Sequence, residues 1–385
     1  MRKVKLGDIC TIISGTTPKS KIKEYWGGDN VWITPAELDE NSFIINDSER
    51  HITDLAVTKS GLKSFPKGTV ILSSRAPIGK TAIAGCKMYC NQGFKNLICS
   101  NAIYNVYLYY YLKSKTLYLN SLGRGATFKE ISKRLVEDIE IPLPEKKKQI
   151  KIGNTLRAIE ILIEKRNKQL LLFEELIKSR FIEMFGELGK DDKEWGLTKL
   201  GECCELNPKR PRNIKDELLV SFVPMPAVSE DGKIDCSDIR PYKEVSKGFT
   251  YFEENDVLFA KITPSMENGK GAVAKGLVNG IGSGSTEFHV LRPIVGKSNP
   301  YWLYIITMFK SFRLGAKKVM TGTGGQLRVP IGYLNNYPIS LPPIELQNNF
   351  EDFVHRIDKS RMAVQKSLDE LELLKKSLLQ EYFGC

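Results

Sequence analysis

The residues of this chain that could act in catalysis are its histidines and a few short segments that resemble catalytic motifs. Its three histidines, His51, His289 and His355, have no nucleophile partner in the sequence pattern. LPPI at residues 341–344 lacks the Asn or Asp and the aromatic residue of an adenine methyltransferase motif. NGKG at residues 268–271 lacks the earlier glycine of a phosphate-binding loop. We therefore expect no catalytic residue, although a cryptic metal-dependent nuclease site on scattered carboxylates is an alternative.

The eight cysteines of the chain are its candidate metal ligands. Cys86 and Cys90 are four residues apart, but no second Cys or His pair follows at the distance of a zinc site. We expect reduced, mostly buried thiols and no metal site, with metal ligation as the alternative. The N-terminus MRKVKLGDIC lacks the apolar core of a signal peptide, and no apolar run reaches the roughly 18–20 residues of a membrane span. These patterns predict a cytoplasmic protein that contacts no membrane and holds no cofactor of its own.

Positive charge is in excess over the whole chain. The sequence has 57 Lys and Arg against 45 Asp and Glu, a formal net charge of +12 at pH 7. Such an excess suits a polyanionic partner, and an incidental, solvated basic surface is the alternative. No Lys- or Arg-rich tail is present, so a functional basic surface would have to be built by the fold.

The chain is a duplication. KLGDIC from Lys5 returns as KLGECC from Lys199, and RFIEMFG from Arg180 returns as LLQEYFG from Leu378. Between these landmarks, FPKGTVILSSRAPIGKTAI corresponds to FEENDVLFAKITPSMENGKGAV, and GRGATFKEISKRLVEDIEIPLP corresponds to TGTGGQLRVPIGYLNNYPISLPP. Landmarks that recur in one order indicate one unit that was repeated with different loops.

Each copy predicts a β-rich domain of mixed α/β type followed by a long helix. Runs of β-branched and aromatic residues alternate with Gly/Pro turns, as in short strands. A short aromatic helix is expected over residues 106–119 and again over residues 300–312. The fold class is therefore α+β. The expected bounds are residues 1–144 and 187–344 for the two domains, and residues 145–186 and 345–385 for the two long helices.

The two long helices carry apolar residues at alternating spacings of four and three. This heptad pattern predicts a packed seam and not only an amphipathic face. Arg166 in the first helix, and Arg361 and Lys375 in the second, interrupt the seam with basic residues, which fix register at a cost in stability. The apolar seam positions are Ile152, Leu156, Ile159, Ile163, Leu170, Phe173 and Ile177, then Phe350, Val354, Ile357, Val364, Leu368, Leu371, Leu378 and Tyr382.

The simplest partner for each long helix is the other one, running antiparallel within the same chain. The two domains would then be related by a pseudo-two-fold axis and separated by an antiparallel two-helix coiled coil. Oligomerisation through either helix is an alternative, as is an assembly protein whose charge is incidental. Two similar basic domains on a rigid bar suit duplex DNA, whose half-sites recur with a turn of about 34 Å. Because the copies have diverged, we expect the half-sites to differ.

Three strings of the first copy resemble the specificity (S) subunit of type I restriction–modification systems. They are KLGDICTIISGTTPKS, VILSSRAPIGK and GATFKEISKRLVEDIEIPLPEKKKQI, and the second copy repeats the pattern. The resemblance covers nearly the whole chain, although TGTGGQLRVPIGYL in the second copy departs from the acidic and basic helical character of the first. It implies two target-recognition domains, each reading one half of a bipartite site, with the two helical regions acting as a ruler.

The same resemblance implies partners for a chain that has no catalytic residues. It implies double-stranded DNA, two modification subunits that bring S-adenosylmethionine and adenine methylation, and two restriction subunits that translocate and cleave DNA with ATP and Mg²⁺. These cofactors are expected on the partner subunits and not on this chain.

Residues for DNA contact are chosen by side-chain type and by the turns that hold them. Arg, Lys, hydroxyl groups and backbone amides contact phosphates, while Arg, Lys, Asn and Gln pair with base edges. Arg124 and Thr127 lie in a Gly-rich turn that leads into an expected helix, where Lys129, Lys133 and Arg134 follow at helical spacing. The full prediction is Arg75, Lys80, Gln92, Lys95, Asn96, Arg124, Thr127, Lys129, Lys133 and Arg134 in the first copy, and Lys261, Lys270, Lys317, Lys318, Gln326 and Arg328 in the second.

Overall fold

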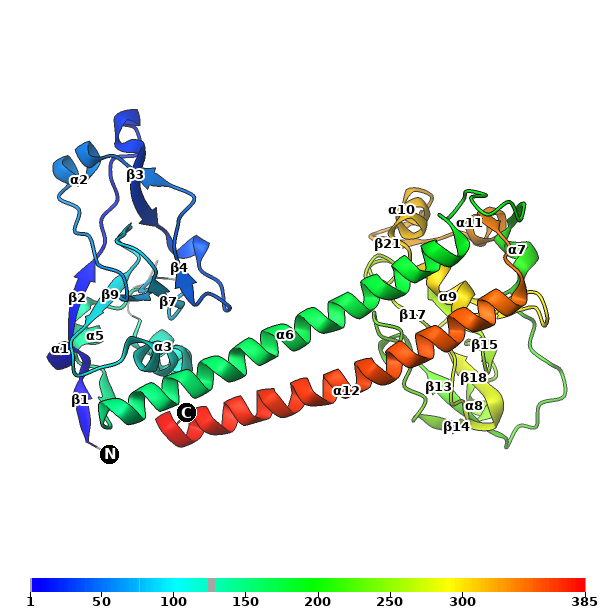
Figure 1. Ribbon diagram of the computed structural model, residues 1–385. Coiled ribbons are helices and arrows are strands. Elements are labelled where there is room, and N and C mark those ends of the chain that lie inside the picture. The colour runs from blue at the N-terminus through cyan, green and yellow to red at the C-terminus, as the bar shows by residue number, and fades with distance from the viewer. Residues whose placement is uncertain (1, 76, 124–128, 385) are drawn as a thin grey trace. The chain divides into compact units, whose positions relative to one another are not determined.

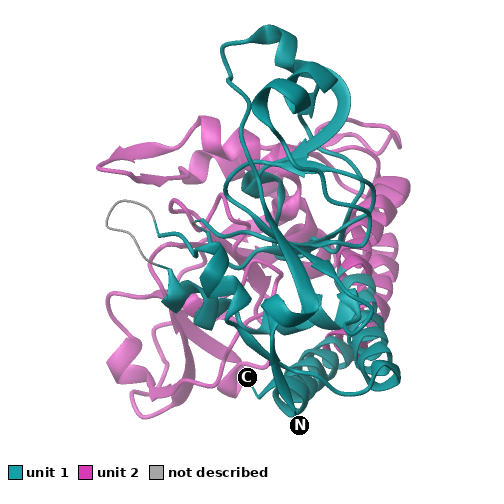
Figure 2. Cartoon of the chain, turned by 90° about the vertical axis from the view of Figure 1, so that its left-hand side faces the viewer, with its two compact units in different colours: residues 1–167, 366–385 teal, residues 168–365 magenta. Residues whose placement is uncertain are grey.

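The structure, a computed structural model, describes residues 2–75, 77–123 and 129–384. The chain divides into two compact units. Unit 1 comprises residues 1–167 and 366–385, and unit 2 comprises residues 168–365 (Figure 2). Each unit therefore contains a globular part and one stretch of each of the two long helices, α6 (Lys146–Phe185) and α12 (Ile344–Phe383).

Unit 1 is built on a five-stranded sheet of order β2-β9-β6-β7-β4 (Figure 1). Its strands are antiparallel except for the parallel pair β4 and β7. A smaller sheet has the order β5-β3-β8, and β1 pairs with β10. The strand bounds are β1 Lys3–Lys5, β2 Cys10–Ser14, β3 Trp26–Ile33, β4 Ile44–Ile45, β5 His51–Ile52, β6 Val70–Leu72, β7 Thr81–Ala84, β8 Tyr89–Cys90, β9 Lys95–Cys99 and β10 Glu140–Pro142.

The helices of unit 1 pack a tyrosine-rich segment against its large sheet. Tyr107, Leu108 and Tyr109 are fully buried in one apolar cluster with the strand residues Val70 and Leu72. The single aromatic helix expected over residues 106–119 is instead two helices, because the chain leaves helical geometry at Lys115. The bounds are α1 Leu6–Ile9, α2 Asp54–Ser60, α3 Asn105–Ser114, α4 Thr116–Leu122 and α5 Lys133–Glu137, with short 3-10 turns η1 Lys23–Tyr25 and η2 Pro35–Glu37.

Unit 2 contains two four-stranded sheets, of order β12-β19-β16-β17 and β14-β13-β18-β15. Strand β11 pairs with β22, and β20 pairs with β21 as a separate hairpin. The strand bounds are β11 Leu197–Lys199, β12 Cys204–Leu206, β13 Leu219–Val223, β14 Ile239–Pro241, β15 Thr250–Glu253, β16 Val257–Ala260, β17 Gly271–Val273, β18 Ile281–Gly284, β19 Phe288–Pro293, β20 Thr321–Thr323, β21 Gln326–Arg328 and β22 Pro338–Ser340.

The helices of unit 2 follow the same order along the chain as those of unit 1. The helix expected over residues 300–312 is again two helices, because Phe309 has extended backbone (φ −65°, ψ 136°). The bounds are α7 Leu200–Cys203, α8 Tyr242–Val245, α9 Pro300–Met308, α10 Lys310–Lys318 and α11 Ile331–Asn336, with 3-10 turns η3 Met225–Ala227 and η4 Val278–Gly280.

A buried glutamine repeats the same three hydrogen bonds in both units. Gln149 Oε1 accepts from the backbone N–H of Tyr104 at 2.8 Å, and its Nε2 donates to the carbonyls of Ala102 and Pro144 at 3.0 and 2.8 Å. Gln347 makes the corresponding bonds to Asn299, Lys297 and Pro342 at 2.8, 3.0 and 2.8 Å. The matching bonds confirm the duplication and align the units: α6 with α12, and α3 with α9.

In unit 1, the start of α6 and the end of α12 run antiparallel and share one core. Ile152 and Leu156 of α6 belong to the same buried cluster as Phe383 of α12. Farther along α6, the buried carboxylate of Glu160 accepts hydrogen bonds from Lys375 of α12 and Lys113 of α3, at 2.8 and 2.9 Å. The basic seam position Lys375 therefore has a carboxylate partner.

In unit 2, the end of α6 and the start of α12 also run antiparallel. The rings of Phe181 and Phe185 meet the ring of Phe350 edge-on, with centroids 5.5 and 5.4 Å apart. Arg361, the other basic seam position of α12, reaches Glu174 of α6 at 3.5 Å and Asp231 at 3.0 Å. Each of these contacts lies within its own unit.

The described part of the chain also bears on the membrane and metal expectations. None of its helices is both long and apolar enough to cross a membrane. The seven described cysteines are free thiols. No group of three or more His, Cys, Asp or Glu side chains within residues 2–75, 77–123 and 129–384 is arranged to hold a metal ion.

Glu160 offers a direct test of the contact between the two long helices in unit 1. Burial by itself would raise the pKa of Glu160, but hydrogen bonds and charge from Lys375 and Lys113 outweigh it and lower the pKa to about 2. Substituting Glu160→Gln leaves two ammonium groups facing each other without a carboxylate. We expect the free energy of unfolding to fall by about 3 kcal/mol or more, because removing one partner of a buried ion pair strands the other. Urea unfolding followed by circular dichroism would measure it.

The matched control is Glu164→Gln, one helical turn farther along α6. Glu164 accepts from Arg157 at 3.0 Å, but its side chain is 45% exposed. An exposed pair contributes only about 0–1 kcal/mol, so this variant should unfold close to the parent chain. Equal losses in the two variants would show that the buried cluster does not hold the helices together.

Candidate nucleic-acid interface

The β20–β21 hairpin of unit 2 has an exposed turn and is held at its base by hydrogen bonds. Its turn is Gly324–Gly325, and both glycines have positive φ (62° and 79°), as tight two-residue hairpins require. Residues 321–326 are exposed, including the predicted contact Gln326. The hydroxyl of Thr263 donates to the carbonyl of Gly325 at 2.7 Å and accepts from the N–H of Leu327 at 3.1 Å. The hairpin is thus tied to the segment that follows β16.

At the base of the hairpin, the predicted contact Arg328 is held by an acidic residue. Its guanidinium donates to both carboxylate oxygens of Glu287, at 2.9 and 2.8 Å. The Arg328 hydrogen bonds, together with its charge, hold the pKa of Glu287 below its ordinary value. Lys261, another predicted contact, is half-buried beside them, and this burial lowers the pKa of its amine. Two predicted cations and one carboxylate therefore form a single cluster.

Unit 1 has a related cluster, in which an acid stands at the place of Arg328. Glu130 accepts from Arg75 at 2.8 Å and from Lys95 at 3.1 Å. Burial opposes ionisation of Glu130, but its bonds to Arg75 and Lys95 keep its pKa below the ordinary value. Where unit 1 has Glu130, unit 2 has Arg328 at the base of the β20–β21 hairpin. Isolated backbone bridges join Arg75 to Glu130 and Ile262 to Arg328 at these equivalent places.

Two predicted lysines hold backbone turns in a matching way. Lys80 Nζ donates to the carbonyls of Pro35 and Leu38, at 3.2 and 2.5 Å, around the 3-10 turn η2. Lys270 Nζ donates to the carbonyl of Met225 at 3.4 Å, at the start of η3. Both amines are part-buried in this position. Lys80 and Lys270 thus stabilise the turns η2 and η3 by hydrogen bonds to backbone carbonyls. DNA contact by these two lysines stays a prediction.

Burial argues against direct DNA contact by two predicted residues. Asn96 is fully buried, and its Nδ2 lies 2.9 Å from the sulfur of Cys90. Lys95 is only 5% exposed and faces Ser74 and Glu130. Both follow from strand alternation in β9, whose two faces are covered by the unit 1 core. These two residues were predicted from their side-chain type, and the sequence pattern does not show that the unit 1 core covers both faces of β9.

The remaining predicted residues are exposed or lie outside the described residues. Arg124 and Thr127 fall outside the described residues. The expected helix from Lys129 is shorter than predicted, since α5 begins at Lys133 with Ser132 as its cap. Lys317 forms an ion pair with Glu267 at 2.5 Å. The exposed residues are Gln92, Lys129, Lys133, Arg134, Lys317 and Lys318.

Sequence reasoning missed the acids that position the predicted cations. Glu130 and Glu287 each lie next to the segments that carried the prediction, in FKEIS and STEFH. An acid close to several predicted phosphate contacts was the available signal. It also missed two arginines that cover aromatic rings: Arg50 lies 3.9 Å from the ring centroid of Trp26, and Arg240 lies 4.0 Å from that of Phe222.

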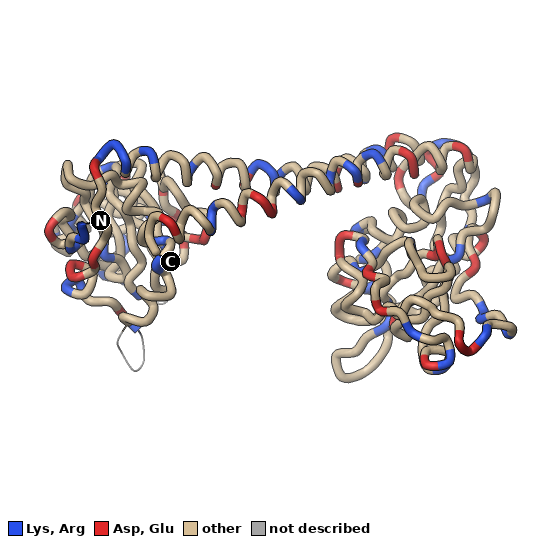
Figure 3. The backbone as a smooth tube through the Cα atoms, turned by 90° about the horizontal axis from the view of Figure 1, so that it is seen from below, with Lys and Arg blue, Asp and Glu red and all other residues tan. Residues whose placement is uncertain are grey.

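Basic residues are not segregated along the backbone. Figure 3 shows Lys and Arg interspersed with Asp and Glu along the globular parts and along both long helices. The net positive charge is therefore spread out, and local pairs such as Arg328–Glu287 cancel part of it. A nucleic-acid surface on this chain would depend on individual exposed cations and not on one basic block.

The sequence matches one family model in both copies. The match is to the type I restriction modification DNA specificity domain, over residues 1–172 and again over residues 192–373. The MjaIX specificity subunit of a type I restriction enzyme from Methanocaldococcus jannaschii is 29% identical over 405 residues, which cover 97% of this chain and 90% of that protein. The EcoAI specificity subunit from Escherichia coli is 38% identical over 192 residues, 48% of this chain and 32% of that protein.

Solved structures share the fold over the whole length. The S subunit of a type I restriction–modification system from M. genitalium superposes with a TM-score of 0.61 at 16% identity, covering 99% of this chain and 96% of the other. A chain from work on complex assembly and conformational transition of the type I R-M system gives 0.58 at 17% identity, covering 99% and 97%. These likenesses confirm the predicted mixed α/β class with two repeated domains and long helices.

Lys318 tests whether α10 and the adjoining hairpin contact phosphates. Lys318→Ala removes one exposed positive charge next to that hairpin. We expect weaker duplex binding for every sequence and a salt dependence of log K reduced by about 0.9, the value for one lost phosphate contact. Fluorescence anisotropy with a labelled duplex at several salt concentrations would measure both.

The control for Lys318 is another exposed lysine of unit 2. Lys193 lies on the loop between α6 and β11, so Lys193→Ala makes the same change of net charge away from the predicted contacts. Its salt dependence should match that of the parent chain. If Lys193→Ala and Lys318→Ala behaved alike, the hairpin side of unit 2 would not be the DNA-contacting surface.

Proposed function

The chain belongs to the type I restriction modification DNA specificity family, and we propose that each of its two domains reads one half of an asymmetric bipartite DNA site. The specificity subunit is the DNA-recognition component of a type I restriction–modification system and not its enzyme. The proposal assigns one half-site to residues 1–144 and the other to residues 187–344. Family membership favours this function over a metal-dependent nuclease on the same scaffold.

The observation that carries the proposal is that the two units share the same helix-anchoring hydrogen bonds but differ in the segments beside the predicted contact residues. Gln149 and Gln347 make the same three bonds in their own units. The segments beside the predicted contact residues differ: unit 2 has a Gly-Gly hairpin with Arg328 at its base, and unit 1 has Glu130 at the equivalent place. Two readers with the same frame and different contact residues would recognise different base sequences.

The long helices are proposed to set the spacer between the half-sites. Supporting this, α6 and α12 pair antiparallel within each unit, through Glu160 and Lys375 in unit 1 and through Glu174 and Arg361 in unit 2. A continuous helix rises about 1.5 Å per residue, so its length measures distance in simple steps.

The long helices are also proposed to dock the other subunits. Several of their apolar side chains are exposed, as protein-contacting surfaces often are. The proposed partners are double-stranded DNA, two modification subunits with S-adenosylmethionine, and two restriction subunits with ATP and Mg²⁺, in the cytoplasm. The exposed large apolar residues are Ile150, Leu162, Leu171, Leu172, Leu176 and Ile182 of α6, and Met362, Leu373 and Leu374 of α12.

Exchanging one domain tests the assignment of half-sites. Residues 1–144 would be replaced by the corresponding domain of a relative with another target, and methylated adenines would be mapped in cells that carry the modification subunit. We expect one half of the methylated site to change and the other half to stay, because only one reader differs. The reciprocal exchange of residues 187–344 should change the opposite half. A change of both halves in either exchange would contradict the assignment.

A matched deletion tests the ruler. Removing residues 163–169 from α6 and 366–372 from α12 takes one heptad from each helix and keeps the paired register. We expect unchanged half-sites and a spacer shorter by about three base pairs, since seven residues span about 10 Å. Deleting the heptad from α6 alone is the control, and it should impair folding by breaking the register. An unchanged spacer in the folded double deletion would rule out the ruler.

A further inference from the structure

The two units have an acidic residue at the same position of their long helices, but the side chains around this residue differ. The alignment set by Gln149 and Gln347 brings Glu160 of α6 into correspondence with Asp358 of α12. The neighbours Leu156 and Val354 also correspond, and both are buried. The two acids can therefore be compared group by group.

In unit 1 the acid has four partners, of which Arg157 of α6 is the most distant at 3.4 Å. Tyr110 donates its hydroxyl hydrogen to Glu160 at 2.8 Å, and the amines of Lys113 and Lys375 donate at 2.9 and 2.8 Å. Two aliphatic lysine side chains and one tyrosine ring therefore fill the space around this buried carboxylate.

In unit 2 three of these four positions are apolar, and the fourth, Arg157, corresponds to His355. The alignment replaces Tyr110 by Ile305, Lys113 by Met308 and Lys375 by Ile177. Asp358 has no hydrogen-bond or ion-pair partner among the residues that the structure describes. Its burial raises the pKa of its carboxyl group, with Arg361 and His355 acting in the opposite direction. An ionised carboxylate in such surroundings is costly unless a cation approaches it.

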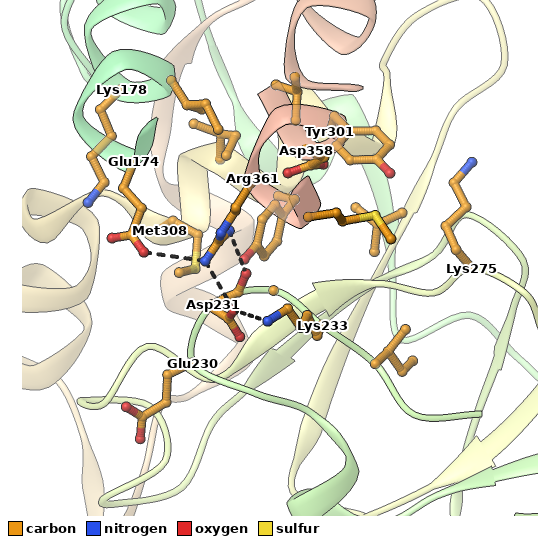
Figure 4. A pocket seen from close by; sticks show the side chains of 18 residues that line it. Glu174, Lys178, Glu230, Asp231, Lys233, Lys275, Tyr301, Met308, Asp358 and Arg361 are labelled. Atoms are coloured by element: carbon orange, nitrogen blue, oxygen red, sulfur yellow. Dashed lines mark hydrogen bonds and ion pairs between the residues drawn. The ribbon is translucent and has the colours of Figure 1, made fainter. Parts of the chain in front are cut away.

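At these positions unit 2 has a cavity of about 490 Å³, whose lining includes Ile177, Ile305, Met308 and Asp358. A volume of this size is typical of small-molecule sites, which range from about 300 to 1,000 Å³. The walls come from α6, α9, α12 and the loop after η3, and all lie in unit 2 (Figure 4).

Three of the four cations that line this cavity have partners other than Asp358. Arg361 points to Asp231 at 3.0 Å and to Glu174 at 3.5 Å, and Lys233 pairs with the same Asp231 at 2.9 Å (Figure 4). Lys275 lies with its amine 5.9 Å from the ring centroid of Tyr301. Asp358 is thus an acid of the lining that none of these three cations pairs with, and the apolar side chains of Ile177, Ile305 and Met308 belong to the same lining.

We propose that this cavity binds a primary aliphatic amine, whose ammonium group pairs with Asp358 and whose carbon stem lies against Ile177, Ile305 and Met308. The ligand would take the place that Lys113 and Lys375 hold in unit 1. Because the cavity walls include both long helices and the globular part of unit 2, a bound amine would brace the helices against that globular part. The proposal does not depend on the reading of half-sites.

The test uses n-butylammonium, which copies a lysine side chain, with the full-length chain. Isothermal titration calorimetry should show saturable binding of one equivalent, and the melting temperature should rise with ligand concentration. Butan-1-ol has the same stem without the charge and is the control ligand. Butan-1-ol should bind at least tenfold more weakly, and equal binding of the two would overturn the proposal.

Two substitutions probe the site from opposite sides. Asp358→Asn removes the lone carboxylate, so it should raise the melting temperature of the free chain and weaken n-butylammonium binding at least tenfold. Met308→Lys rebuilds the unit 1 arrangement within the cavity and should also weaken the amine at least tenfold. Unchanged affinity in either folded variant would overturn the proposal.

Lys275 is the internal competitor, because its amine lies near Tyr301 at the same cavity. Lys275→Ala should leave n-butylammonium affinity within about twofold of the parent chain if the site is open to a ligand. Binding that appears only in Lys275→Ala would show that the chain fills the site with its own lysine, and it would overturn the proposal as well.

Discussion

The attachment of each long helix to its globular part depends on one buried side-chain amide. Gln149 and Gln347 are 1% and 0% exposed, and each uses its acceptor and both donors on backbone groups of two loops. A buried polar group that loses its partner costs about 1–3 kcal/mol, so neither loop can shift without that cost. The direction in which α6 or α12 leaves its own domain is therefore set by three bonds at its first turn. The packing of the seam, the ion pairs along it and the walls of the unit 2 cavity follow from that direction.

Backbone anchors and charged contacts have changed differently between the two copies. The glutamines keep all their bonds because their partners are main-chain groups, which every residue supplies. Ion pairs need only opposite signs, so Glu130 of unit 1 could stand where unit 2 has Arg328, each with an oppositely charged partner. At Glu160 and Asp358 the acid itself persisted while its cationic partners changed to Ile177 and Met308. The frame is thus constrained by geometry, whereas the charges were free to diverge.

This difference explains what could be predicted from the sequence. Heptad spacing is local information, so both long helices and their basic seam positions were within reach, and the bounds differ by only one or two residues at the ends. The aromatic helices were expected as single elements, since no proline marks the breaks at Lys115 and Phe309. The burial of Asn96 and the ion pairs of Arg75 and Arg328 depend on residues distant in sequence. Such tertiary contacts leave no periodic pattern, so the candidate site was predicted by residue type and its internal neutralisation was not.

The internal pairing of the predicted cations also bears on how such a surface would meet DNA. A guanidinium held by a carboxylate is already oriented, yet it adds no net charge, so it contributes little to non-specific attraction and counterion release. A phosphate or a guanine edge that replaced Glu287 as the partner of Arg328 would have to make up for two hydrogen bonds that the carboxylate already accepts. The exchange is favourable only where the incoming group matches the geometry of the carboxylate. Neutral pairs at Arg75 and Arg328 therefore suit discrimination between sites, while exposed lysines such as Lys129 and Lys318 suit general affinity.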